Sequence, residues 1–141
     1  MQKLKPLAVK VLITCVLFQG ISGIFGGVGL IIDPSGKTLS IPLIWLQDSP
    51  FSDYLIPGIV LFTILGVFPL IISVGLIKGK PLSWRMTLML AFALIIWILV
   101  EIIIIGYQAD PPLQLIYGLL GVAMLMLTLS TSTKKYFNTP K

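Results

Sequence analysis

The sequence predicts an all-α fold, a four-helix transmembrane bundle, from its composition and from the way its apolar residues are distributed. Of 141 residues, 57% are hydrophobic and 11% are charged, whereas a soluble domain is about half apolar and roughly one quarter charged. The apolar residues form four long runs that lack the alternation of a strand. Since no water satisfies backbone polar groups inside a bilayer, such runs must cross it as helices. We therefore expect a single membrane domain over residues 1–141, embedded in the lipid bilayer.

The first apolar run covers residues 11–32 and follows Lys3, Lys5 and Lys10. As a helix it would be about 33 Å long, which is enough for a hydrocarbon core of about 30 Å. A cleaved signal peptide has an apolar region of only about 7–15 residues and then a small-residue cleavage site. This run is longer and lacks such a site, so we expect an uncleaved membrane anchor.

Three further apolar runs predict spans at residues 54–77, 86–105 and 113–133. Pro69 lies inside the second span, where its ring and its missing N–H predict a kink. A short basic turn at 78–85 joins the second span to the third, and a turn at 106–112 joins the third to the fourth.

The basic residues predict the orientation of the bundle. With four spans, the N-terminal segment, the 78–85 turn and the C-terminal tail share one side of the membrane and carry nine Lys and Arg, whereas the other side carries only Lys37. Because cytoplasmic loops are enriched in Lys and Arg, we predict that both termini are cytoplasmic and that the loop at 33–53 is extracytoplasmic. Topology thus explains the net charge of +5, and we expect no nucleic acid partner.

The predicted outer loop, residues 33–53, is longer than a helix connection needs, and loops of this length are usually functional or disordered. Its middle is apolar, so we expect a short interfacial helix within residues 41–47. Asp33 begins an Asp-Pro-Ser-Gly sequence, and an aspartate in such a turn commonly binds its own backbone. Asp53 precedes the second span, where it is placed to cap the helix.

Small and weakly polar residues recur along three of the spans, where they permit close backbone approach and interhelical hydrogen bonds. Gly23 and Gly27 form a small-xxx-small pair in the first span. We expect these residues to mark the seams of the bundle. The others are Cys15, Gln19, Ser22, Gly26 and Gly29 in the first span, Thr63, Gly66 and Ser73 in the second, and Gln114, Gly118, Gly121 and Thr128 in the fourth.

The residues that much enzyme chemistry needs are missing from the chain. There is no histidine, which is the commonest metal ligand and a frequent general base. The one cysteine, Cys15, has no partner in the chain for a disulfide or a redox pair. We therefore expect no catalytic residue, no metal and no other cofactor.

Glu101 is the only charged residue inside a predicted span, and an ionisable group there marks a functional site by default. We interpret it as part of a pocket that opens to the outside, with Glu101 near the floor. Trp97 and Tyr107 would lie beside it, and Gln19 or Ser22 would face it from across the bundle.

A structural alternative pairs Glu101 with Lys37 or with Gln108, so that the carboxylate fixes the bundle; ion pairs of this kind also occur without a function. The candidate ligand-binding residues of the pocket interpretation come from the spans and from the outer loop. They are Glu101, Trp97, Tyr107, Gln19, Asp33, Lys37, Asp53 and Tyr54.

Two stretches of the sequence resemble a known group of proteins. IDPSG closes the first span and SPFSDYLIPGIVLF opens the second. These two segments are similar in sequence to small uncharacterised four-span membrane proteins of bacteria, and the order of spans and loops in the chain resembles that of the DoxX-like group. The resemblance implies a multi-pass protein of the bacterial cytoplasmic (inner) membrane, and it implies no catalytic residues.

Two functions from different classes follow from these observations. The first, which the sequence favours, is a non-enzymatic bundle that oligomerises or serves as a subunit of a larger membrane assembly. The second is the binding or transport of a small lipophilic molecule, lipid-like or quinone-like, in an outward-facing pocket around Glu101. An inward-facing Glu101 in an open pocket would favour the second function, and a salt-bridged Glu101 in a filled core would favour the first.

Overall fold

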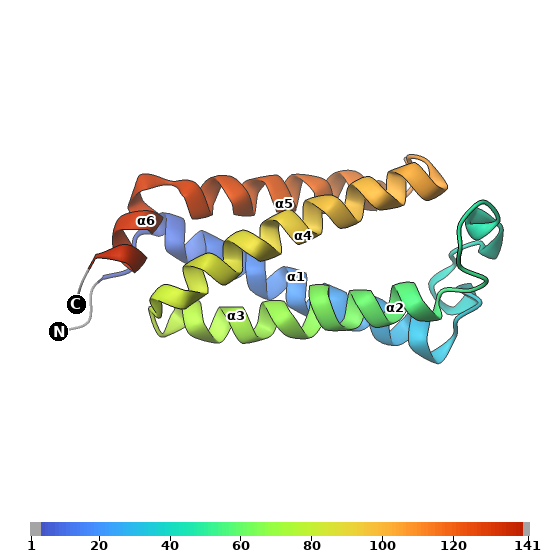
Figure 1. Ribbon diagram of the computed structural model, residues 1–141, viewed down its shortest axis with the longest axis horizontal. Coiled ribbons are helices and arrows are strands. Elements are labelled where there is room, and N and C mark those ends of the chain that lie inside the picture. Colours follow the sequence, from blue (N-terminus) through green and yellow to red (C-terminus); the bar gives the residue numbers. More distant parts are fainter. Residues whose placement is uncertain (1–3, 140–141) are drawn as a thin grey trace.

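Helices are the only regular elements in residues 4–139, the part of the chain that the computed structural model describes (Figure 1). No strand occurs in these residues, so the all-α prediction is confirmed for them. The elements are α1 (Leu7–Ile32), η1 (Lys37–Leu39), η2 (Leu43–Leu46), α2 (Leu55–Phe62), η3 (Thr63–Val67), α3 (Phe68–Ile77), α4 (Pro81–Ile105), α5 (Leu113–Leu129) and α6 (Thr131–Asn138).

The long helices run along one axis and define two ends of the molecule (Figure 1). We call the end that holds the start of α1 and α6 the terminal end, and the end that holds residues 33–54 and 106–112 the loop end. Three helical segments are long and apolar enough to cross a membrane: Leu7–Ile32, Leu55–Ile77 and Pro81–Ile105. A fourth is added if Leu113–Leu129 and Thr131–Asn138, which meet at a bend of 59°, form one span.

Three helices differ in extent from the predicted spans, because hydropathy marks apolar residues and not the extent of a helix. α1 begins at Leu7 and α4 at Pro81, so that Lys10 and Arg85 lie within helices. Proline suits a first helical turn because its missing N–H would be unpaired there in any case. α5 ends at Leu129, before the predicted limit at residue 133. The Ser130 side chain accepts a hydrogen bond from the Thr133 N–H and caps α6, which starts a new helix direction.

The irregularity expected at Pro69 takes the form of a π-helical turn, η3, directly before it. In this turn the Phe68 N–H donates to the Thr63 carbonyl, five residues back. In an α-helix the Leu65 carbonyl would accept from residue 69, but proline has no N–H to donate. The side chain of Gln19 supplies a donor from α1, because its Nε2 lies 3.1 Å from the Leu65 oxygen. The π-helical turn η3 is thus hydrogen-bonded to α1.

α1 packs closely on this broken helix through its glycines. A Cβ at Gly23 would clash with the Leu65 carbonyl oxygen, and one at Gly27 would lie 2.6 Å from the Cα of Phe62. Only glycine fits at either position, so the expected small-xxx-small contact is confirmed. Ser22 and Gly26 are half-buried beside this contact and instead line a cavity described below.

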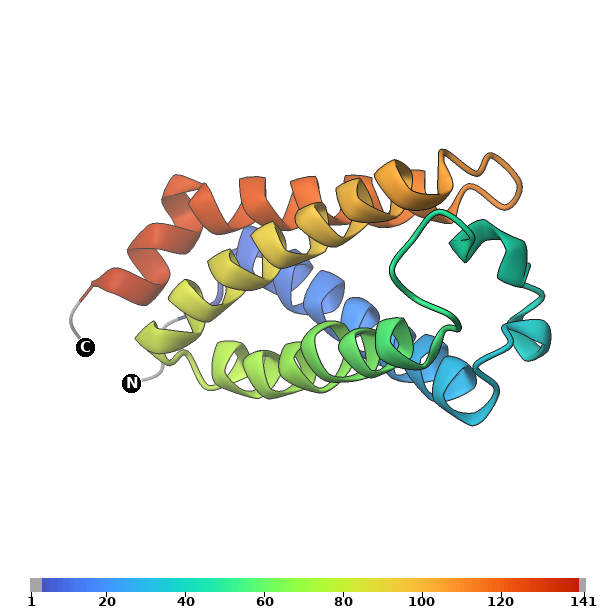
Figure 2. The same cartoon turned by 45° about the vertical axis from the view of Figure 1, so that its right-hand side comes forward.

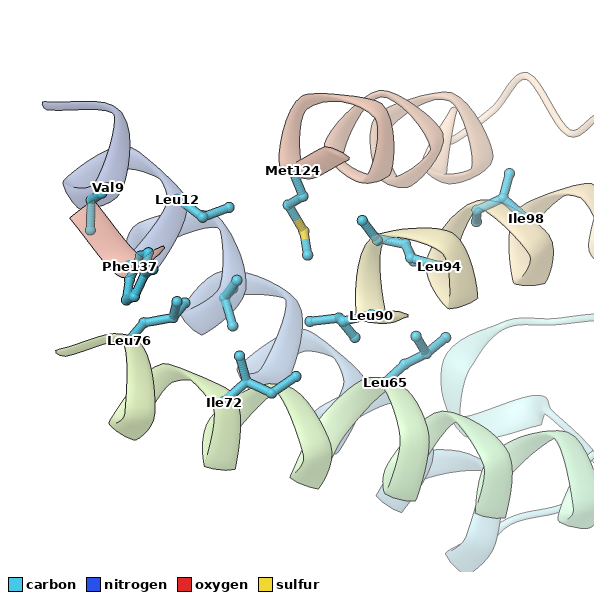
Figure 3. Packing of buried hydrophobic residues seen from close by; sticks show 12 residues of the cluster. Val9, Leu12, Leu65, Ile72, Leu76, Leu90, Leu94, Ile98, Met124 and Phe137 are labelled. Carbon is cyan, nitrogen blue, oxygen red and sulfur yellow. The ribbon is translucent and has the colours of Figure 1, made fainter. Parts of the chain in front are cut away.

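The best-packed part of the protein lies towards the terminal end (Figure 3). There, side chains from all long helices and from α6 meet, and the largest of them are fully buried. Outward-facing apolar side chains remain exposed along each of the long helices. The buried cluster contains Val9, Leu12, Val16, Leu65, Ile72, Leu76, Leu90, Ala91, Leu94, Ile98, Met124 and Phe137.

Towards the loop end the helices separate into two pairs. α1 packs on α2 and α3, and α4 packs on α5, whereas only a few contacts join the two pairs away from the terminal end. Figure 2 shows α4 and α5 diverging from α1 and α2, with η1 and η2 lying across the open end. This divergence creates the space in which the candidate site lies.

We expect Gly23→Ala to destabilise the protein far more than Gly118→Ala does. The added methyl group at Gly23 meets backbone, which cannot move aside, whereas at Gly118 the nearest atom is a side-chain carbon 3.6 Å away. Overpacking of this kind costs about 1–3 kcal/mol. Thermal unfolding in the same detergent measures the difference, and equal melting temperatures for the two variants would contradict the close contact.

We also expect Gln19→Leu to destabilise the protein by about 1–3 kcal/mol, because it removes the donor to a buried carbonyl. In a Pro69→Ala background the loss should shrink by about 0.5–3 kcal/mol, since that change restores a backbone N–H within reach of the Leu65 oxygen. Unfolding in SDS titrations of the four proteins gives the coupling. Strictly additive effects would mean that Gln19 does not compensate for Pro69.

Candidate functional site

A cavity of about 660 Å³ lies between the two helix pairs, beneath the residues of the outer loop. Side chains from α1, α2, η3, α4 and α5 form its wall, and the loop closes over it. Most of the wall is apolar. Its polar and aromatic members are Gln19, Ser22, Ser40, Trp45, Phe51, Tyr54, Trp97, Glu101, Gln108, Asp110, Gln114 and Tyr117.

The cavity extends well into the helical part of the protein. At about 1.5 Å per residue, Glu101 lies about 6 Å from the loop end of α4, whereas Gln19 lies about 20 Å from the loop end of α1. Glu101 therefore lies in the part of the cavity wall nearest the loop end, and the expectation that it lies near the floor of the cavity was wrong. Gln19 and Leu65 line the deep end.

Glu101 faces the cavity as a partly buried carboxyl group. The side chains of Trp97, one helical turn earlier, and of Gln114, on α5, stand close enough to interact with it. No Lys or Arg nitrogen in residues 4–139 lies within 4.0 Å of a carboxylate oxygen. The pairing of Glu101 with Lys37 therefore does not occur in the structure.

Gln108 and Gln114 form a hydrogen-bond network beside Glu101. The Gln108 N–H donates to the Gln114 Oε1 at 2.8 Å, and the Gln114 Nε2 donates to the Gly106 carbonyl at 3.1 Å. The Gln108 Nε2 donates to the Ile105 carbonyl at 2.8 Å, so its side chain is held by the end of α4 rather than by Glu101. These hydrogen bonds hold the 106–112 turn and the part of the cavity wall nearest the loop end.

Tyr54 fastens the outer loop over the cavity. Its hydroxyl donates to the Pro42 carbonyl at 2.7 Å, and its N–H donates to the Pro34 carbonyl at 2.9 Å. Only 6% of the residue is exposed. Burial and, after it, the negative charge of Glu101 raise the pKa of the Tyr54 hydroxyl, so this group stays a donor at neutral pH.

Asp33 holds the beginning of the loop and does not line the cavity. Its carboxylate accepts the Ser35 hydroxyl at 2.6 Å and both the hydroxyl and the N–H of Thr38, at 2.8 and 2.9 Å. Hydrogen bonds from the Ser35 side chain first, and then from Thr38, lower the pKa of Asp33 to about 2. The turn predicted at this aspartate is thus confirmed, with Thr38 as an additional partner.

The other candidate residues divide between the cavity and its surroundings. Gln19, Tyr54, Trp97 and Glu101 line the cavity, whereas Asp33, Lys37, Asp53 and Tyr107 lie outside its wall. Asp53 accepts a hydrogen bond from the Leu55 N–H at 3.0 Å, but the N-cap of α2 is Tyr54 and no side chain caps the helix, so the predicted cap was wrong. The interfacial helix expected within 41–47 is represented by the 3₁₀ helix Leu43–Leu46.

Sequence reasoning missed several residues of the wall. Gln114 was interpreted as a packing residue, and Gln108 as a partner of Glu101 only. Trp45 and Tyr117 line the cavity from the outer loop and from α5. The sequence signal for these residues was the presence of aromatic and amide side chains near the loop end of three helices. The cavity itself results from the divergence of the helix pairs, which the sequence does not show.

Comparison of the chain with protein-family models, with curated proteins and with solved structures found no match. The class of the protein therefore follows from its own features. It is all-helical over the described residues, and three or four of its helices are long and apolar enough to cross a membrane, as in a multi-pass membrane protein.

The Asp33 network predicts an acid transition at the start of the loop. Because the pKa of Asp33 in the folded protein, about 2, lies below the ordinary value of 3.8, its stabilisation is fully present above about pH 4 and is lost as the pH falls through about 2. The amide proton shift of Thr38, followed by NMR, should titrate near pH 2.

Ser35→Ala should move this midpoint upwards, since it removes the largest contribution, whereas Ser52→Ala, in an exposed part of the same loop, should leave it unchanged. A Thr38 shift that does not respond between pH 5 and pH 1.5 would contradict the assignment of the network.

Proposed function

We propose that this chain is a membrane protein that binds a small amphipathic molecule in the cavity at its loop end. The observation that carries the proposal is a cavity of about 660 Å³ with one acidic side chain, Glu101, in its wall. Binding sites for small molecules typically have about 300–1,000 Å³ and apolar walls with a few polar groups. An ionisable residue within a span is expensive to keep and usually serves a function.

The cavity wall supports this function better than a structural role does. A structural Glu101 would be paired and enclosed by side chains, but it has no cationic partner among the described residues and it lines an open volume. The side chains of Trp97 and Gln114 lie close enough to interact with its carboxyl group. The outer loop, which is held by the hydrogen bond from Tyr54 to Pro42, covers the cavity at the loop end.

The orientation follows the charges. Lys5, Lys10, Lys78, Lys80 and Arg85 belong to the terminal end, which we propose to be cytoplasmic by the positive-inside rule. The cavity would then face outwards, across a bacterial cytoplasmic membrane in which α1, the helix from α2 to α3, α4 and α5 form four spans. Labelling of single cysteines at Ser52 and Ser132 from either side tests this arrangement.

Assembly with a second copy or with another membrane subunit remains a prediction from the sequence. The exposed apolar faces of the helices do not favour it over contact with lipid, because both present the same surface. The cavity is the feature that requires a further explanation, so we place ligand binding first.

Native mass spectrometry of the protein, extracted from its host membrane in mild detergent, tests the proposal. We expect a bound small molecule in the wild type and its loss in Ser22→Phe, which fills the cavity from α1. The Ser22 hydroxyl bonds only to the Phe18 carbonyl of its own helix, so the change leaves no other group unpaired.

Thr14→Phe is the matched control, because the Thr14 hydroxyl likewise bonds four residues back, to Lys10, and its side chain is exposed away from the cavity. Val100→Trp fills the same cavity from α4 and serves if Ser22→Phe does not fold. The same adducts on the wild type and on a folded, cavity-filled variant would refute a ligand site in this cavity.

A further inference from the structure

The charge of the cavity wall is opposite to that of the chain as a whole. The protein carries a net charge of +5, yet the described residues that line the cavity include two carboxyl groups, Glu101 and Asp110, and no Lys or Arg. Aromatic rings from three elements, Trp45, Trp97 and Tyr117, line the same volume. Carboxylates attract cations, and aromatic faces add a further attraction when they surround a cation.

Several hydrogen-bond donors of the wall near Glu101 are engaged by the protein itself. The Tyr54 hydroxyl is used by Pro42, and the side-chain amides of Gln108 and Gln114 are used by the carbonyls of Ile105 and Gly106. A molecule that enters the cavity near Glu101 therefore finds these donors engaged, whereas the Glu101 carboxyl group has no cationic partner among the described residues.

Gln19 adds an acceptor at the deep end of the cavity. Because its Nε2 must donate to the Leu65 carbonyl, the orientation of the amide is fixed and Oε1 is an acceptor. Only 2% of Gln19 is exposed, and its Oε1 is the one buried side-chain oxygen or nitrogen in residues 4–139 without a hydrogen-bond partner. A buried acceptor without a donor is unfavourable, so this part of the wall has no donor to spare for an anionic or acceptor group.

We propose that the cavity binds a lipophilic amine, with the protonated amine at the Glu101 carboxylate beside Trp97 and the apolar part directed along the wall towards Leu94 and Leu65. This inference rests on the proposed function and specifies the chemical class of its ligand. An ammonium group supplies three donors and no acceptor, which matches the wall. A fatty acid would place a second anion beside Glu101.

The test compares decylamine, decanol and decanoic acid, which share one apolar chain and differ in the head group. Each is titrated into the wild type and into Glu101→Gln in nanodiscs of phosphatidylcholine, whose zwitterionic surface does not itself favour either charge. Binding is measured by native mass spectrometry and by the shift in melting temperature. Asp48→Asn, which removes an exposed carboxylate of the outer loop away from the cavity, is the matched control.

We expect the wild type and Asp48→Asn to bind decylamine about tenfold more tightly than decanol, as a charge-assisted hydrogen bond is stronger than a neutral one. In Glu101→Gln this preference should disappear while decanol still binds. Equal binding of decylamine and decanol to the wild type, or tighter binding of decanoic acid, would overturn the inference and leave the cavity a ligand site of another class.

Failure of all three compounds to bind the wild type would overturn the amine inference as well. It would bear on the proposed function only together with an adduct pattern that Ser22→Phe leaves unchanged. A preference for decylamine that persists in Glu101→Gln and is lost in Asp110→Asn would place the amine at the other carboxylate of the wall, and this too would overturn the assignment to Glu101.

Discussion

The close approach of α1 to the helix from α2 to α3 is the contact on which the rest of the structure depends. In lipid the hydrophobic effect does not hold helices together, so association relies on close packing and on hydrogen bonds between helices. Gly23 and Gly27 bring the two backbones into contact. Gln19 adds a hydrogen bond to the Leu65 carbonyl at the site where Pro69 has withdrawn the usual donor. Gln19 thus joins the two helices and supplies a donor to the carbonyl that lacks one in the broken helix.

The packing of the helices in two pairs explains how a cavity forms between them. α4 and α5 form a second pair, and the two pairs are joined by the cluster towards the terminal end, where α6 inserts Phe137. Because most helix contacts lie within the pairs, the pairs do not touch along their whole length. They diverge towards the loop end, and the loop held by Tyr54 and Asp33 spans the gap.

The spans were predictable because the apolar runs are long, and their ends at Ile32, Ile77 and Ile105 were placed correctly since a charged residue or a glycine follows each run. The end of α5 was not, because the Ser130 cap is a local hydrogen bond that hydropathy does not register. Glu101 stood out as the only charge within a span. Its relation to Gln108 and Gln114 depends on how the 106–112 turn folds back, which no spacing in the sequence specifies.

The composition of the cavity wall bears on what can occupy it. The cavity has a volume of about 660 Å³ and is partly open, so lipid, water or a ligand can enter it. A lipid chain satisfies the apolar wall but not Glu101, and water satisfies Glu101 but not the apolar wall. An amphipathic molecule satisfies both, which is why the wall favours ligand binding over a packing defect.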